Sequence, residues 1–231
     1  NGEFIDTYYN GASIDPNTIT FNQLDAAKPK IVPRHFKKPE NLVKVVSKLT
    51  TTLELDGVHV PGTADCSAYL EIRNGSIESL VFGQNNGTYR YVLKNVTITN
   101  TMDFNGRVLY IENSDIKLKT FPYLTHIYAN DNSLVRSGWT LDKGTISCLD
   151  SRWQMNTTKD VQASFNGSII ETGTVKSKWV AIFNSRVTTG KIQVYPYTES
   201  SPSTHYQFKM MAENSVFDTD IEFVPDGLWD I

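Results

Sequence analysis

The sequence predicts an all-β protein, a right-handed parallel β-helix with coils of about 18 residues and a short N-terminal capping helix. The first observation behind this prediction is a recurring motif: Asn or Asp, a mostly small residue, any residue, then a bulky apolar residue. Successive motifs are 16 to 21 residues apart, most often 18, except for one spacing of 30, and such a period is typical of solenoid repeats. The motifs begin at Asn74, Asn95, Asn113, Asn132, Asp150, Asn166, Asn184 and Asn214, and Asp56-Gly57 fits one period earlier.

The second observation is an alternation of apolar residues before each Asn, as in Leu109 and Ile111 or Val180 and Ile182. A period of two predicts a strand with one buried face. Each repeat is therefore strand, bend, strand, with the Asn at the bend, where it tolerates a left-handed backbone. Stacked coils would place the Asn amides in a ladder. An antiparallel sandwich or barrel with regularly spaced strands stays the alternative.

The elements follow in order along the chain. Residues 1–38 are expected to be an extended lead-in or the edge of an adjoining module. The pattern of residues 39–50 predicts the capping helix, with an apolar face formed by Leu42, Val46 and Leu49. The valines in this segment are also compatible with a strand. The repeats predict a β-helix over residues 51–231. An inserted loop at 195–205 accounts for the long spacing between the motifs at Asn184 and Asn214. We expect the solenoid to continue into further chain or a partner.

Composition and charge exclude several classes of protein. With 39% hydrophobic and 11% aromatic residues the chain can bury a core, so disorder is excluded. No apolar run reaches the roughly 20 residues that cross a bilayer, so no membrane insertion is expected. A net charge of −3 argues against a nucleic-acid partner. No metal, nucleotide or serine-hydrolase motif is present, and no metal or cofactor is expected.

The two cysteines, Cys66 and Cys148, fall about four coils apart, which separates them by roughly 20 Å. A disulfide needs Cα atoms within about 7 Å. We therefore expect two free thiols and synthesis in a reducing compartment.

Candidate catalytic residues come from the column just before the Asn. This column places Glu112 and Asp131 on neighbouring coils, where paired carboxylates could act as acid and nucleophile or base in glycoside cleavage. The alternative is an outward charged column stabilised by Lys94 and Lys117.

Candidate glycan-binding residues are of two kinds. Tyr195 and Tyr197 flank a proline in the inserted loop and offer aromatic platforms, or they anchor the loop on a neighbouring subunit. Trp139 is a second candidate platform. Lys117 and Arg136 lie in one outward column, which either holds an acidic sugar or is a solvated face. Trp153 belongs to the inward column and is expected in the core.

The Asn-Ser-x-aliphatic coils with β alternation, preceded by a short helix, resemble the parallel β-helix tailspikes and tail fibres of bacteriophages over roughly residues 40–224. The resemblance implies a homotrimer on the virion tail, made in the bacterial cytoplasm and attached extracellularly to a host surface polysaccharide. A polysaccharide depolymerase of the same fold, hydrolase or lyase, is the alternative, and a bacterial surface adhesin is a second. The Gly-Asp-Gly and Thr-Asp-Asp stretch of many such proteins is missing, so no catalytic residue is carried over from the family.

Overall fold

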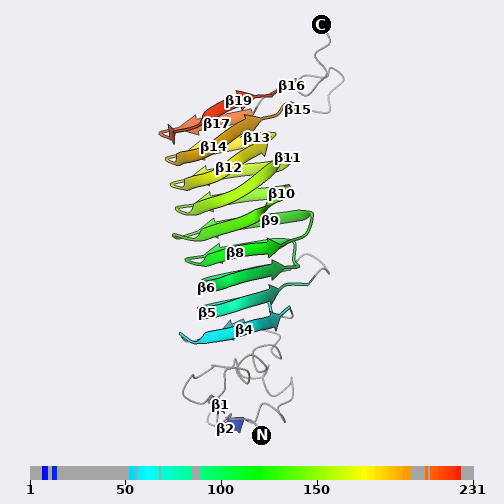
Figure 1. Ribbon diagram of the computed structural model, residues 1–231, viewed down its shortest axis with the longest axis vertical. Helices are drawn as coiled ribbons and strands as arrows, with labels where there is room; N and C mark the ends of the chain where they lie inside the picture. Colours follow the sequence, from blue (N-terminus) through cyan, green and yellow to red (C-terminus); the bar gives the residue numbers. More distant parts are fainter. Residues whose placement is uncertain are drawn as a thin grey trace. The chain divides into compact units, whose positions relative to one another are not determined.

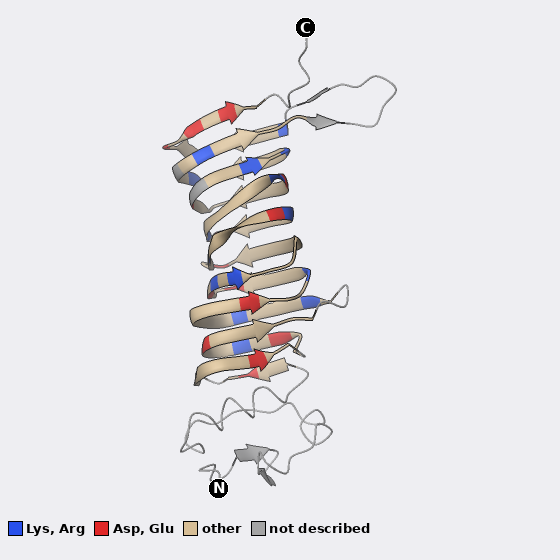
Figure 2. Ribbon diagram, turned by 45° about the vertical axis from the view of Figure 1, so that its right-hand side comes forward, with Lys and Arg blue, Asp and Glu red and all other residues tan. Residues whose placement is uncertain are grey.

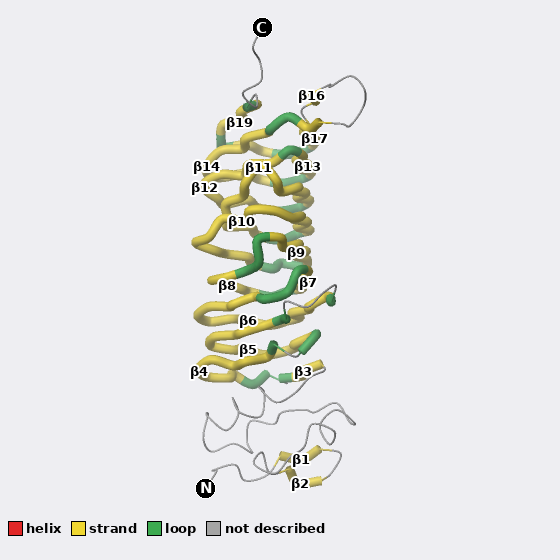
Figure 3. The backbone as a smooth tube through the Cα atoms, turned by 90° about the vertical axis from the view of Figure 1, so that its right-hand side faces the viewer, coloured by secondary structure: helices red, strands yellow, loops and turns green. Residues whose placement is uncertain are grey.

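The computed structural model describes residues 7–9, 12–14, 52–55, 57–67, 69–84, 89–198, 206–207 and 209–224. The predicted capping helix at 39–50 lies outside the described residues, as does most of the lead-in. The described part of the lead-in is a pair of antiparallel strands, β1 (Thr7–Tyr9) and β2 (Ala12–Ile14). The described residues form strands and loops and no helix (Figure 3). Consequently, they offer no helix that could span a membrane.

The chain divides into two compact units, residues Asn1–Pro122 and Tyr123–Ile231. Both are parallel β-solenoids, with about 7 turns between them and repeats about 18 residues apart, so the predicted all-β parallel β-helix architecture is confirmed. Within each unit, strands of successive turns lie side by side (Figure 1). Strands that lead into the Asn bend form a pre-bend sheet, and strands that leave it form a post-bend sheet.

The first unit contains β3 (Thr52–Glu54), β4 (His59–Cys66), β5 (Glu71–Phe82), β6 (Arg90–Phe104), β7 (Val108–Glu112) and β8 (Asp115–Thr120). Its pre-bend sheet has the order β3-β5-β6-β7, and its post-bend sheet has the order β4-β5-β6-β8, all parallel. Strands β5 and β6 belong to both sheets because each runs through the bend.

The second unit contains β9 (Leu124–Asn130), β10 (Leu134–Leu149), β11 (Arg152–Asn166), β12 (Ile169–Ser177), β13 (Trp179–Phe183), β14 (Arg186–Val194), β17 (Lys209–Glu213), β18 (Val216–Phe217) and β19 (Asp220–Phe223). Its pre-bend sheet has the order β9-β10-β11-β13-β17, and its post-bend sheet runs β10-β11-β12-β14 and then β18 and β19, all parallel. A short antiparallel hairpin, β15 (Tyr197–Thr198) with β16 (Tyr206–Gln207), interrupts the solenoid where the sequence predicts an inserted loop.

The core consists of the inward residues of the alternating strands. In the first unit Ile72, Leu93 and Ile111 stack in register and are buried. In the second unit Trp153 is fully buried, as the sequence predicts, and its ring packs edge-on against Phe165 at a centroid distance of 6.2 Å.

The Asn bends have the predicted left-handed backbone and the predicted ladder. The φ angles are 56° at Asn74, 54° at Asn95 and 44° at Asn113. The Nδ2 of Asn95 donates to Oδ1 of Asn74 at 2.7 Å, and Asn113 donates to Asn95 at 2.9 Å. In the second unit Asn184 donates to Asn166 at 3.1 Å. The side-chain amides therefore continue the hydrogen bonding along the stack at the bends.

The repeat at Asn166 differs from the predicted frame by one residue. Gly167, with φ 59°, takes the left-handed position, and Asn166 lies level with Phe183. As a result Ile170 is buried, whereas Ile169, the bulky apolar residue of the predicted motif, is 36% exposed.

A second ladder, which the sequence reading missed, is made by the serines that follow the bends. The backbone N–H of Ser151 donates to Oγ of Ser168 at 3.2 Å, and that of Ser168 donates to Oγ of Ser185 at 3.0 Å. The hydroxyls of Ser151, Ser168 and Ser185 in turn donate to the carbonyl two residues before them, as Ser185 does to Phe183 at 2.6 Å, and Ser133 donates to the carbonyl of Asn130. The serines therefore satisfy buried backbone groups at the bend, which is why this column is Ser over six successive motifs, from Ser114 to Ser215.

Both cysteines are free, as predicted, and both are buried. Burial raises the pKa of the Cys66 and Cys148 thiols well above the usual value, and the nearby Asp65 carboxylate adds to the effect at Cys66. Because the thiolate is the reactive species, we expect neither thiol of the native protein to react with Ellman's reagent at pH 8, and both to react in denaturant. Rapid native-state labelling of either cysteine would contradict this.

Candidate functional site

Trp139 is presented to solvent by a bulge in β10. The register of β10 against β11 pairs Arg136 with Gln154 and Thr140 with Asn156, so three residues of β10 face one residue of β11. The two extra residues push the chain outward, and Trp139 is 63% exposed. The backbone N–H of Trp139 donates to Oγ of Ser137 at 3.0 Å, which fixes the bulge locally. The bulge therefore exposes a large ring on an otherwise regular scaffold.

Two more aromatic residues lie at the same end of the turns of the second unit. Tyr123 is 65% exposed and directly precedes Leu124, whose register partner is Lys143 in the segment that follows the Trp139 bulge. Tyr195 directly follows β14, and its N–H donates to the carbonyl of Ser177 at 2.9 Å. We call this end of the turns, opposite the Asn bends, the aromatic corner; it comprises Tyr123, Trp139, Tyr195 and the β15–β16 hairpin that begins with Tyr197.

The aromatic corner combines rings with charged groups. The Nζ of Lys159 lies 6.0 Å from the centroid of the half-buried Tyr195 ring. Asp160, which follows Lys159 in β11, forms an ion pair with Lys178 at 3.2 Å. The strands that carry Trp139 and Tyr195 are three turns apart in the sheet order, which corresponds to about 14 Å along the stack. A ligand that contacts both rings would therefore have to be an extended molecule.

The other predicted glycan-binding residues lie elsewhere. Arg136 is half-buried on the outer side of β10, three residues before Trp139. Lys117 is exposed on β8, which belongs to the first unit. Of the five predicted residues, Trp139, Tyr195 and Tyr197 thus fall on the aromatic corner. The sequence reading missed Tyr123, although its position beside Pro122 between two repeats was a visible signal of an exposed turn.

The predicted carboxylates occupy different kinds of position. Glu112 ends β7 in the first unit and forms an ion pair with Lys94 on the neighbouring turn, as the charged-column alternative expects. Asp131, in the second unit, lies at the bend itself with φ 53°, and Asn130 takes the place before the bend. The catalytic role of the two carboxylates stays a prediction.

Among the described residues, no group of three or more His, Cys, Asp or Glu could hold a metal ion. The aromatic corner places flat apolar rings beside exposed hydrogen-bonding groups. Aromatic rings of this kind bind ligands that have one apolar and one polar side.

The fold and the corner together define a class of protein, a parallel β-solenoid with an exposed aromatic site on one side of its turns. In comparisons with known proteins, no family model matches the chain, and no curated protein or solved structure matches it either.

Proposed function

We propose that this chain is a segment of a trimeric phage tailspike or tail fibre that attaches the virion tail to a polysaccharide on the bacterial surface. The proposal assigns the contact with the polysaccharide to the aromatic corner. The general support is the parallel solenoid with Asn bends, the feature on which the resemblance to tailspikes rests. The single observation that carries the binding role is the bulge that exposes Trp139.

The bulge has no role in the solenoid core. The inward residues of this turn, Val135 and Leu141, are buried on either side of it, so the ring of Trp139 adds nothing to the packing. The exposed ring leaves a large apolar surface in water, so covering it with a ligand would be favourable. Sugars are suitable ligands because their C–H faces pack on aromatic rings while their hydroxyls hydrogen-bond to neighbouring polar groups. A rigid scaffold with a protruding segment is also a common way to present a binding site.

Replacing Trp139 with alanine should weaken polysaccharide binding at least about fivefold, since a central aromatic contact is typically worth more than about 1 kcal/mol. The wild-type chain is first screened against immobilised capsular polysaccharides and O-polysaccharides. Isothermal titration calorimetry with an oligosaccharide of the bound polysaccharide then gives Kd for each variant. Tyr89→Ala is the matched control, because Tyr89 is also an exposed aromatic residue, at 56%, but lies in the first unit. An unchanged Kd for Trp139→Ala would remove the aromatic corner from the proposal.

A cleavage assay with the bound polysaccharide distinguishes an attachment protein from a depolymerase. Release of reducing ends, or of unsaturated products, from the bound polysaccharide would favour the depolymerase alternative. In that case the Glu112→Ala and Asp131→Ala double variant should lose the release. Full activity in the double variant would exclude these two carboxylates as the catalytic pair.

A further inference from the structure

In the second unit, three adjacent outward columns of the pre-bend sheet contain no Asp, Glu, Lys or Arg over four successive turns. The register of β9, β10, β11 and β13 places Leu124, Lys143 and Asp160 in a charged outward column beside the aromatic corner, and the other outward residues in three uncharged columns. We call this surface the uncharged face; its columns are His126, Thr145, Gln162 and Trp179, then Tyr128, Ser147, Ser164 and Ala181, then Asn130, Leu149, Asn166 and Phe183.

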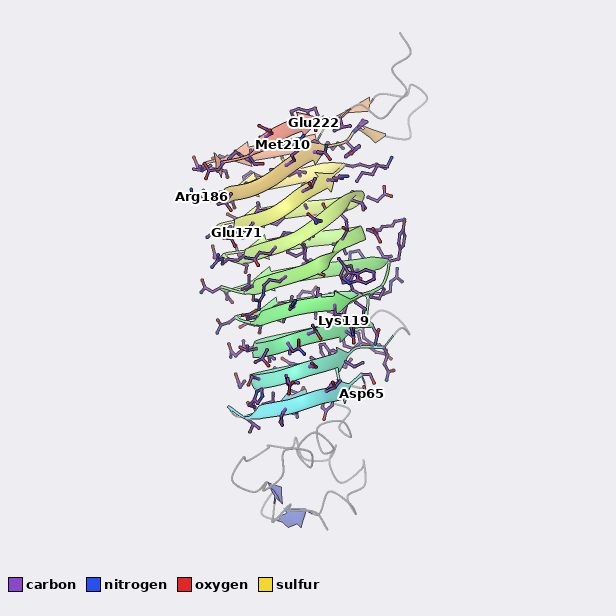
Figure 4. All side chains as sticks on the ribbon, in the orientation of Figure 1. Asp65, Lys119, Glu171, Arg186, Met210 and Glu222 are labelled. Atoms are coloured by element: carbon purple, nitrogen blue, oxygen red, sulfur yellow. The ribbon has the colours of Figure 1, made fainter. Side chains whose placement is uncertain are left out.

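The post-bend sheet of the same unit is different. Arg152 pairs with Glu171 at 2.8 Å, and Arg186 pairs with Asp218 at 2.8 Å. The hydrogen bond from Arg152, together with one from Gln154, lowers the pKa of the Glu171 carboxyl. Figure 4 shows Glu171 and Arg186 projecting into solvent at the edge of their turns, and Figure 2 marks the charged positions on each turn. Solvent-facing strands of this solenoid therefore carry charges as a rule, and the uncharged face departs from that rule.

The composition of the uncharged face is typical of a protein interface. Interfaces are depleted in charged residues at their centre and enriched in aromatic residues, and this face carries Tyr128, Trp179 and Phe183. Its middle column begins with Tyr128 and continues with the small residues Ser147, Ser164 and Ala181, of which Ala181 is buried. A second flat surface can therefore approach the sheet closely at Ser147 and Ser164.

The face is also complementary to itself. The hydroxyl groups of Thr145, Ser147 and Ser164 and the amides of Gln162 and Asn166 each both donate and accept hydrogen bonds. A partner that bears carboxylates or ammonium groups would bury them here without a counter-charge, which is costly. Another copy of the same chain supplies an uncharged surface with matching donors and acceptors. Charged residues bound the face on the next turn, at Lys209 and Glu213.

We propose that the uncharged face of the second unit is the surface through which copies of this chain associate with one another. This inference rests on the proposed function, which includes a homotrimer, and assigns the subunit contact to named residues. Four turns at about 4.8 Å, with strands of about five residues, give a patch of roughly 300 Å². Stable interfaces bury about 800 Å² on each partner. Because this patch is smaller, the association of the chain alone should be weak and should be seen only at higher concentrations.

Sedimentation equilibrium between about 1 and about 100 µM tests the proposal directly, since micromolar association is readily resolved in that range. The wild-type chain should shift from the mass of one 26.0 kDa chain to a multiple of it. Ser164→Arg, in the middle of the face, should raise the dissociation constant of self-association at least about tenfold, because the buried cation has no counter-charge. Thr188→Arg is the matched control, because it places the same cation on the outer side of the post-bend sheet in the same unit.

Both variants are first compared with the wild type by circular dichroism and thermal melting. If Ser164→Arg does not fold, Gln162→Arg replaces it, because Gln162 is exposed on the same face and accommodates a long side chain. A wild-type chain that stays monomeric over the whole range overturns the proposal. Equal dissociation constants for Ser164→Arg and the wild type also overturn it.

The outcome is distinguishable from that of the polysaccharide experiment. A short oligosaccharide is used for Kd, so that loss of multivalent binding does not imitate loss of the site. Under the proposal Ser164→Arg changes the mass and leaves oligosaccharide affinity intact, whereas Trp139→Ala changes the affinity and leaves the mass intact. If Ser164→Arg abolishes oligosaccharide binding without changing the mass, the uncharged face binds the glycan and the proposal is wrong.

Discussion

Replacing Gly144 with alanine should lower the free energy of unfolding by about 4 kcal/mol, the range reserved for severe backbone or core disruption. Gly144 lies in β10 directly beside Thr125 of β9, with φ 140°. A Cβ at this position would lie 1.8 Å from the carbonyl oxygen of Thr125 and 2.7 Å from its carbonyl carbon. The clash is with backbone that the parallel pairing holds in place, so no side-chain rotation relieves it. Glycine is therefore required here both for its φ and for the close approach of two strands.

The midpoint of urea unfolding, followed by far-UV circular dichroism, gives the size of this effect. Gly138→Ala is the control, since a Cβ on Gly138 would meet nothing within 4 Å and Gly138 lies in the same strand. The control should stay within about 0.5 kcal/mol of the wild type, as exposed positions usually do. A Gly144→Ala variant with the wild-type midpoint would mean that β9 and β10 do not approach as closely as described.

Replacing Ser168 with alanine should cost about 2 kcal/mol, because it leaves a buried backbone donor unsatisfied. The Oγ of Ser168 accepts the N–H of Ser151 and donates to the carbonyl of Asn166 at 2.9 Å. Both interactions lie at a bend, where the strand hydrogen bonds are interrupted, and the side chain is buried. Water cannot replace the hydroxyl without opening the turn.

Thr99→Ala serves as the control for the serine ladder, since Thr99 is exposed on β6 and lies outside both the serine column and the uncharged face. Urea unfolding of both variants, under the same conditions, isolates the contribution of the ladder. Equal midpoints for the two variants would show that the serines only fill space at the bend.

Much of the fold could be predicted because its signals are local. Asn74, Asn95 and Asn113 were recognised as bend residues because a left-handed backbone and an amide ladder need that side chain at a fixed interval. Alternation assigned Trp153 to the core for the same reason: successive residues of a strand point to opposite faces. The serine ladder was missed because its hydrogen bonds join residues 17 apart, and a small residue at a bend has an adequate local explanation.

The candidate site was only partly predictable. Trp139 was predicted to be an exposed ring, but its bulge was not predicted. The bulge exists because three residues of β10 lie opposite one residue of β11, and no motif in β10 encodes that pairing. Asp131 was assigned to the wrong column because both Asp131 and Asn132 have left-handed backbones, at φ 53° and 63°, and add a residue to that bend.

By itself the sequence determined the class of fold, the period of the turns and the residues at most bends, because each follows from backbone preference or from the alternation of a single strand. Only the tertiary structure decided which outward residues share a surface. A shift of one residue moves every side chain of a strand to the opposite face, as the turn at Gly167 demonstrates for Ile169 and Ile170. The aromatic corner and the uncharged face therefore depend on register, and register is set by the neighbouring turns.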